Sequence, residues 1–234
     1  MASRLRRAAI KRVMPDLYKV APDLNGNVIS RAVTRAIQGV GPLPPAATAA
    51  QRQLAEQGGD VERAVHEVIE NHVRLAASQG LVTNVGGLVT LAATIPVNIT
   101  GLALLQCRMV AAIAHLRGYD LSDPRVRNAL LLCVLGEDAV TALVRSKKLP
   151  GGPMTVATAP AYDPELDKVI AAEVSSALVG RVVGKRAGSA IVRRIPLAGG
   201  VVGAGSDAYS TWQVGRYAGR ELRARPLTRL VKEA

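Results

Sequence analysis

The chain has 234 residues, 49% of them hydrophobic, which is enough for one domain with a sizeable core and does not require two. Its two cysteines, Cys107 and Cys133, lie in apolar stretches without metal-ligand spacing, which argues against a disulfide framework and favours buried free thiols in a reducing compartment. A formal charge of +12 at pH 7 favours an anionic partner.

The positive charge is concentrated at the two ends of the sequence. Residues 1–20 carry six Lys or Arg against one acid, and residues 181–234 carry eleven against three, whereas residues 21–180 carry thirteen against fourteen. Such basic ends suit lipid headgroups or nucleic acid, although a solubilising surface explains any single charge better. The absence of a recognised nucleic-acid motif and the scarcity of aromatic residues for base stacking argue against nucleic acid.

The first 23 residues predict a basic amphipathic helix. Leu5, Val13, Leu17 and Val20 recur at roughly helical spacing among cations, which is typical of a helix lying in a membrane interface and equally of an ordinary surface helix. The cations predicted to bind lipid here are Arg4, Arg6, Arg7, Lys11 and Arg12. Because these charges interrupt any apolar run, the segment lacks the core of a secretory signal, and we expect a cytoplasmic protein.

Turn and capping residues divide the rest of the chain into helices. Breakers flank a helix at residues 29–37, and Gly58-Gly59-Asp60 begins another whose apolar and charged residues occupy opposite faces. Asp123-Pro124 and Asp163-Pro164 each place an N-cap acid before a proline at the first helical position. No stretch alternates like a strand for long, so the sequence predicts an all-α, multi-helix bundle.

An uncharged run at residues 75–107 is the most informative segment. It exceeds the roughly 20 apolar residues that cross a bilayer, but Gly86-Gly87 and Ile95-Pro96 interrupt it and leave pieces on either side of the proline that are too short for two straight spans. We therefore predict a central apolar helical hairpin. Two interpretations stay open: buried helices of a soluble bundle, or a hairpin that dips into one leaflet.

Arg108 is a lone cation on an otherwise apolar helix, where it shares a face with Asn98 and His115. Burying an unpaired guanidinium is energetically unfavourable, so Arg108 must meet a carboxylate, several carbonyls or an anionic ligand. An ion pair with Glu137, Asp138 or another carboxylate is the favoured interpretation. A lipid phosphate is the alternative.

The C-terminal third combines glycines with cations. Glycines recur every four residues at positions 180, 184 and 188, then 199 and 203, then 215 and 219, which favours close helix packing and offers faces for oligomerisation. The cations predicted to bind lipid or another anion here are Arg181, Lys185, Arg186, Arg193 and Arg194. They precede an apolar, glycine-rich segment at residues 195–205, as a headgroup-binding element requires. Tyr209, Trp212 and Tyr217 follow at positions suited to a membrane interface, although core or rim positions explain each of them singly.

Two blocks of sequence resemble the EcsC family. The first comprises LVTNVGGL at residues 81–88, IPVNI at 95–99, Gln106, RMVAAIA at 108–114 and RGYD at 117–120, and the second is IPLAGGVVGAG at 195–205. Their order and co-occurrence extend the resemblance over residues 30–220. The family is named for a protein encoded beside an ABC transporter whose operon affects secretion. The resemblance therefore implies a bacterial accessory of a membrane transport or envelope assembly, and it supplies no catalytic residue.

Enzyme motifs fail on this sequence. HEVIE at residues 66–70 lacks the second histidine of a zinc-protease helix, residues 180–185 lack the spacing of a phosphate loop, and no nucleophile elbow occurs. The sequence thus predicts no catalytic residue, no metal and no cofactor, although an enzyme acting on lipid stays an open alternative.

The predicted organisation is a basic helix at residues 1–23, an EcsC-like helical domain at 24–220 and a basic tail at 221–234. The favoured function is that of a peripheral or monotopic protein that binds an anionic membrane at the inner face of the cell membrane, in contact with a membrane protein complex. The alternatives are a soluble helical protein that holds an apolar or lipid-like ligand in its core, and a nucleic-acid binder.

Overall fold

A computed structural model describes residues 26–39, 44–85, 91–192 and 198–224, and every regular element within these ranges is an α-helix, as the sequence predicts. The predicted N-terminal helix at residues 1–23 lies outside the described residues. The helices are α2 (Gly26–Gln38), α3 (Ala46–Glu56), α4 (Val61–Val85), α5 (Leu91–Leu116), α6 (Pro124–Leu135), α7 (Glu137–Arg145), α8 (Pro153–Ala157), α9 (Pro164–Val192) and α10 (Ala198–Glu221).

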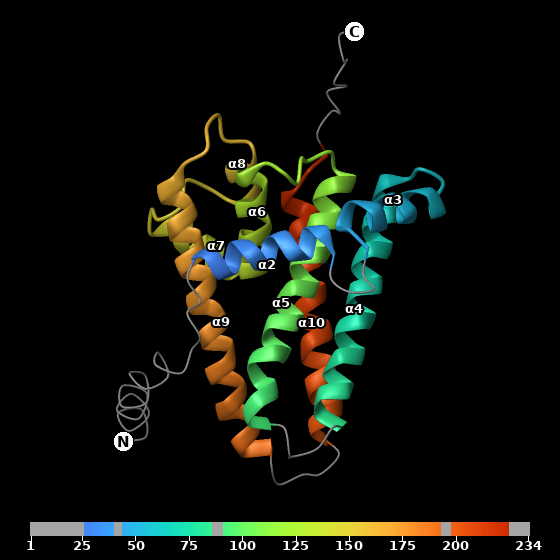
Figure 1. The fold of residues 1–234 in the computed structure, drawn as a ribbon, viewed down its shortest axis with the longest axis vertical. Coiled ribbons are helices and arrows are strands. Elements are labelled where there is room, and N and C mark those ends of the chain that lie inside the picture. Colours follow the sequence, from blue (N-terminus) through green and yellow to red (C-terminus); the bar gives the residue numbers. More distant parts are fainter. Residues whose placement is uncertain (1–25, 40–43, 86–90, 193–197, 225–234) are drawn as a thin grey trace.

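Four long helices, α4, α5, α9 and α10, run along the long axis of the molecule (Figure 1). The shorter helices α2, α3, α6, α7 and α8 gather around the upper half of these four, and α2 crosses α5. The lower ends of α4 and α5 and the lower ends of α9 and α10 reach the same end of the molecule. We call this the distal end, and the opposite half, with the short helices, the proximal half.

The predicted helix starts are confirmed where the structure describes them. The carboxylate of Asp123 accepts a hydrogen bond from the backbone N–H of Arg125 at 2.8 Å, and that of Asp163 accepts one from Glu165 at 2.9 Å. Asp60 accepts one from Arg63 at 3.1 Å at the start of α4. Each acid satisfies a backbone donor that has no partner within its helix, which fixes where the helix begins.

Among the described side chains, most of the core lies in the proximal half, and it is built largely from aliphatic side chains because the chain has no Phe. Met109, Ile113 and Leu130 are among its largest fully buried side chains. Cys107 and Cys133 are free and buried, as predicted, and burial raises the pKa of the Cys107 thiol to about 12. Both thiols therefore behave as small apolar groups of the core.

Helices α4 and α10 lie against each other with a close approach at two glycines. A Cβ added to Gly215 would lie 2.9 Å from a methyl carbon of Ile69, and one added to Gly219 would lie 4.0 Å from Val65. The predicted close packing at this glycine pair is confirmed. Because 215 pairs with 69 and 219 with 65, the two helices are antiparallel, which places residue 209 level with residue 75.

The predicted hairpin of residues 75–107 is present, but its two helices are not separated at Pro96. Helix α4 ends at Val85, directly before Gly86-Gly87, and α5 continues through Pro96. The prediction of a break at the proline is therefore wrong. Glycine readily ends a helix, whereas a proline near a helix start removes only one backbone hydrogen bond.

Candidate functional site

The distal end combines helix segments from two parts of the chain, residues 75–107 and residues 181–206. It contains residues 75–85 of α4, 91–107 of α5, 181–192 of α9 and 198–206 of α10 (Figure 1). None of these segments contains Asp or Glu, and the α4 and α5 segments contain no charged residue at all. Every cation of the distal helices lies on α9, so an uncharged hairpin stands beside a basic helix end.

Some of the predicted lipid-binding cations lie on a described helix, and the others lie outside the described residues. Arg181, Lys185 and Arg186 belong to the last third of α9, and their side chains lie outside the described part. The spacing of Arg181 and Lys185 puts them one turn apart on one face of that helix. The predicted cations that lie wholly outside the described residues are Arg4, Arg6, Arg7, Lys11, Arg12, Arg193 and Arg194.

Large apolar side chains are exposed on the α4 and α10 side of the bundle. Tyr209 is 60% exposed, Trp212 is 39% exposed and Leu75 is 44% exposed. The rings of Tyr209 and Trp212 stack with centroids 6.0 Å apart, and the Arg216 guanidinium lies 5.4 Å from the Trp212 ring centroid. We call Leu75, Tyr209 and Trp212 the apolar belt. With a rise of 1.5 Å per residue, its members lie about 15 to 20 Å from the distal ends of their helices.

Tyr217 does not belong to this belt. Its side chain is buried in the core, and burial together with the nearby Glu221 carboxylate raises its pKa. The interpretation of Tyr217 as an interfacial residue is therefore wrong, because α10 turns that position toward the core while Tyr209 and Trp212 face outward.

Arg108 is buried without a counter-charge. Only 7% of the residue is exposed, and its Nη1 atom is buried and has no hydrogen-bond partner. Among the described carboxylates none forms an ion pair with it, and Glu137 instead pairs with Arg220. The predicted ion pair between Arg108 and Glu137 is therefore wrong, because α10 brings Arg220 to that carboxylate. By contrast, the partly buried Arg117 lies 2.7 Å from Glu62.

His72 of α4 lies close enough to Arg108 for the two to interact electrostatically. Burial lowers the pKa of His72, and the positive charge of Arg108 lowers it further. The Nδ1–H group of His72 donates a hydrogen bond to the Val68 carbonyl at 2.7 Å, which leaves Nε2 for another partner. Burial also lowers the pKa of Arg108. His72 of α4 and Arg108 of α5 are thus two buried titratable groups that lie near each other where these helices pack together.

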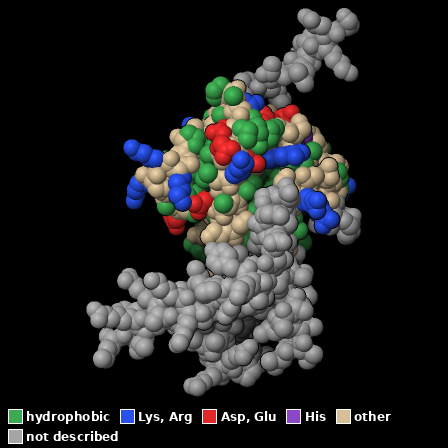
Figure 2. Space-filling view, turned by 60° about the vertical axis from the view of Figure 1, so that its left-hand side comes forward, with side chains coloured by type: hydrophobic (Ala, Val, Ile, Leu, Met, Phe, Trp, Pro, Cys, Tyr) green, Lys and Arg blue, Asp and Glu red, His purple; other side chains and the backbone are tan. Residues whose placement is uncertain are grey.

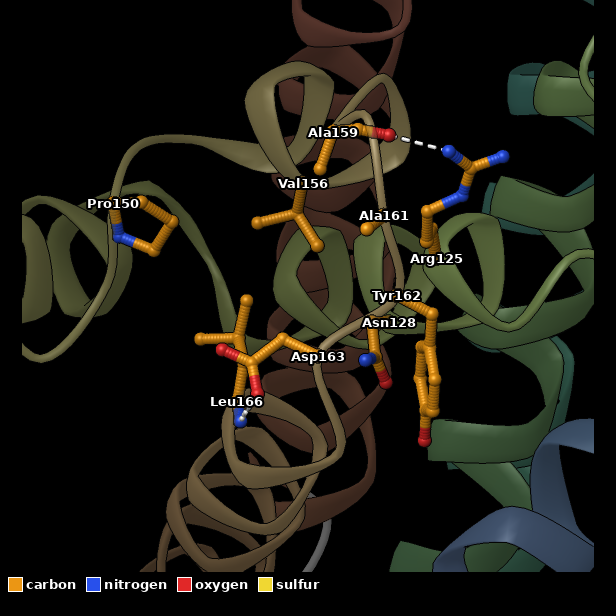
Figure 3. A pocket seen from close by; sticks show the side chains of 9 residues that line it. All are labelled: Arg125, Asn128, Pro150, Val156, Ala159, Ala161, Tyr162, Asp163 and Leu166. Atoms are coloured by element: carbon orange, nitrogen blue, oxygen red, sulfur yellow. Dashed lines mark hydrogen bonds between the residues drawn. The ribbon is translucent and has the colours of Figure 1, made fainter.

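A small pocket in the proximal half lies where α6, α8 and the start of α9 meet (Figure 3). Its volume is about 150 Å³, and it is lined by Arg125, Asn128, Pro150, Val156, Ala159, Ala161, Tyr162, Asp163 and Leu166. Its charged groups already have partners, because Arg125 donates to Asp123 and to the Ala159 carbonyl, and Asp163 caps α9. Ligand pockets usually hold about 300 Å³ or more, so this one does not define a site.

The proximal surface mixes charges of both signs. Figure 2 shows Lys and Arg interspersed with Asp and Glu over the described part of this face. Exposed ion pairs such as Lys148–Glu173, at 2.8 Å, join some of them. The described part of this face therefore carries both signs, whereas the charged residues of the distal helix segments are all basic.

Within the described ranges, no helix is both long and apolar enough to span a bilayer. The same residues contain no cluster of three or more His, Cys, Asp or Glu that could hold a metal ion.

Within the described residues, helices packed around an uncharged hairpin and a glycine-containing helix pair define an all-α protein. Neither the curated proteins nor the solved structures contain a match to this chain. Residues 8–149, more than half of the chain, match the model of the EcsC protein family, and the chain belongs to that family.

Proposed function

We propose that this protein binds an anionic membrane surface with the distal end of its bundle, as a peripheral or monotopic protein at the inner face of the cell membrane. The observation that carries the proposal is the juxtaposition of the uncharged α4–α5 hairpin with the basic end of α9. An apolar element beside cations is the composition that lipid interfaces select. Carboxylates would repel anionic lipid, and the distal helix segments contain none.

The charges of α9 limit how deeply this end enters the membrane. A Lys or Arg near an anionic surface contributes about 1 kcal/mol to binding, whereas a Lys or Arg moved to the bilayer centre costs about 2.5 to 3.5 kcal/mol. The basic end of α9 is therefore expected to stay at the headgroups. The uncharged hairpin carries no such penalty and enters the acyl region.

The apolar belt indicates which side of the bundle leans toward the membrane. Half of a bilayer, headgroups included, is about 20 Å thick. The belt lies about 15 to 20 Å above the distal helix ends. It also contains Tyr209 and Trp212, the residue types enriched at the headgroup level. A tilt that lowers the α4–α10 side brings the belt to the headgroups while α9 stays outside the acyl region.

Flotation of the full-length protein with vesicles tests the proposal. We expect binding to vesicles with anionic phosphatidylglycerol and none to purely zwitterionic vesicles. Replacing Arg181, Lys185 and Arg186 together by Gln is expected to weaken the binding about 100-fold. The matched control replaces the exposed Arg52, Arg145 and Arg223 of the proximal half by Gln, and it should bind like the unmodified protein. If both triple variants lost vesicle binding equally, the net charge of the protein would explain the binding, and the proposal of a distal binding end would be contradicted.

Trp212 reports on the belt directly, because it is the only tryptophan of the chain. Its emission is expected to shift to the blue when anionic vesicles are added, and lipids brominated near the headgroup should quench it more than lipids brominated near the chain end. Flotation without any change in Trp212 emission would confine the contact to the helix ends and remove the belt from the proposal.

A further inference from the structure

The burial of Arg108 requires an explanation that the rest of the fold does not provide. An isolated ion in an apolar interior is strongly unfavourable unless it is paired or hydrogen-bonded. The guanidinium carries five N–H donors in a planar fork, and at least the buried Nη1 lacks an acceptor. Its fork geometry matches carboxylate and phosphate groups. An oxyanion would satisfy both the charge of Arg108 and its free N–H donor.

His72, which lies near enough to Arg108 to interact with its charge, supplies a second potential donor. Because Nδ1–H is engaged with the Val68 carbonyl, only Nε2 can face an incoming group. A neutral His72 would present a lone pair there, and a protonated His72 would present an N–H donor. An anion beside Arg108 would favour the protonated form, since it offsets the charge of Arg108 that now disfavours it.

Open space lies beside Gly101 of α5, on the distal side of Arg108. Gly101 precedes Arg108 by seven residues, so it lies on the same face of α5, two turns or about 10 Å closer to the distal end. A Cβ added to Gly101 would meet nothing within 4 Å. Beyond it the α4 and α5 segments are uncharged as far as their distal ends, about 25 Å from Arg108. An extended acyl chain fits the chemistry of this path.

We propose that Arg108 and His72 form an internal site for the anionic headgroup of one single-chain amphiphile, a fatty acid or a monoacyl phosphate, with its acyl chain passing Gly101 toward the distal end. This site holds one molecule inside the bundle. It is distinct from the membrane surface contact of α9 and the apolar belt, and it does not depend on that contact.

Thermal unfolding of the purified, delipidated full-length protein tests the site. The probes are palmitate, lysophosphatidic acid, uncharged monoolein and inorganic phosphate, each without vesicles and below its micellar concentration. At about 100 times Kd, palmitate or lysophosphatidic acid should raise Tm by about 5 to 10 °C, with the larger rise identifying the headgroup. Monoolein and inorganic phosphate should leave Tm unchanged. An equal rise with monoolein would overturn the anion site, and an equal rise with inorganic phosphate would overturn the acyl path.

Variants separate the site from a merely structural role. Arg108→Gln removes a buried unpaired charge, so it should raise the Tm of the ligand-free protein and abolish the rise produced by the anionic probes. Arg108→Lys should retain part of that rise. His115→Gln on the same helix and Arg52→Gln on α3 serve as matched controls and should retain it fully. A ligand-induced rise that is unchanged in Arg108→Gln would overturn the proposal.

Histidine NMR gives a second, independent measurement. Saturation with the anionic amphiphile should raise the pKa of His72 and leave that of His115 unchanged. An unaltered His72 titration would overturn the role of His72. Because flotation measures surface binding and these measurements use no bilayer, failure of either proposal is recognised without reference to the other.

Discussion

Two glycines of the long helices show how differently the two halves of the molecule are built. At Gly215 the α10 backbone approaches α4 so closely that an added Cβ would lie 2.9 Å from Ile69. At Gly101, on the distal side of Arg108, an added Cβ would meet nothing. The same residue type permits close packing in the proximal half and leaves open space toward the distal end. The proximal half is thus closely packed at Gly215, whereas α5 is open beside Gly101.

The electrostatics follow the same division. In the proximal half, Asp123 accepts hydrogen bonds from Arg125, whose side chain lowers the pKa of that carboxyl, and Glu62 pairs with Arg117. At the border with the distal end, Arg108 has no such partner among the described carboxylates. Asp123 and Glu62 thus have counter-charges within the chain, whereas Arg108 has none among the described residues.

Truncation of a core side chain gives the largest expected effect. Leu130→Ala should lower the free energy of unfolding by about 2 to 5 kcal/mol, because Leu130 is fully buried and its removal leaves a cavity. Leu75→Ala, in the exposed belt, should change it by no more than about 0.5 kcal/mol. Urea denaturation followed by circular dichroism measures both. Similar losses for the two variants would contradict the division into packed core and exposed belt.

Substitution of the two glycines sharpens the comparison further. Gly215→Val should destabilise the protein by about 1 to 3 kcal/mol, since the added methyl groups clash with Ile69. Gly101→Ala should be neutral or stabilising by up to about 1 kcal/mol, because alanine favours a helix and nothing opposes its Cβ. Urea denaturation followed by circular dichroism measures the free energy of unfolding of both variants. Destabilisation by Gly101→Ala would show that the space beside α5 is filled.

Loss of the α6 cap should have an intermediate effect. Asp123→Ala should lower the free energy of unfolding by about 0.5 to 2 kcal/mol, because it removes the acceptor for the Arg125 backbone N–H. Asp123→Asn keeps an N-cap acceptor but loses the ion pair with Arg125, so it should retain most of the stability. An equal loss in both variants would assign the stabilisation to the ion pair rather than to the cap.

The smallest expected effect is the pH dependence of stability. Burial lowers the pKa of His72 and of His115 in the folded protein, so below the unfolded pKa of about 6.5 the unfolded chain binds more protons. Stability should therefore fall as the pH drops below about 6.5. His72→Gln should reduce this fall, as measured by Tm between pH 7.5 and 5.5. An unchanged slope in this variant would mean that His72 is not buried in its neutral form.

Much of the fold could be predicted because its signals are local. Asp123-Pro124 and Asp163-Pro164 mark helix starts through hydrogen bonds between neighbouring residues, and the uncharged hairpin follows from composition alone. The site was harder to predict. The place of the hairpin break was wrong because glycine and proline signals compete over ten residues. Which aromatic residues face outward depends on how α10 packs against α4, so Tyr217 could not be separated from Trp212 in advance.

By itself the sequence determined the helices, the family, the aliphatic core and the concentration of positive charge, since each depends on residue type and spacing along the chain. Only the tertiary structure decided that the α4–α5 and α9–α10 ends lie at the same end of the molecule. It also decided that Glu137 forms its ion pair with Arg220 and not with Arg108. These outcomes depend on contacts between helices distant in sequence. No local pattern encodes which charge is paired and which is buried alone.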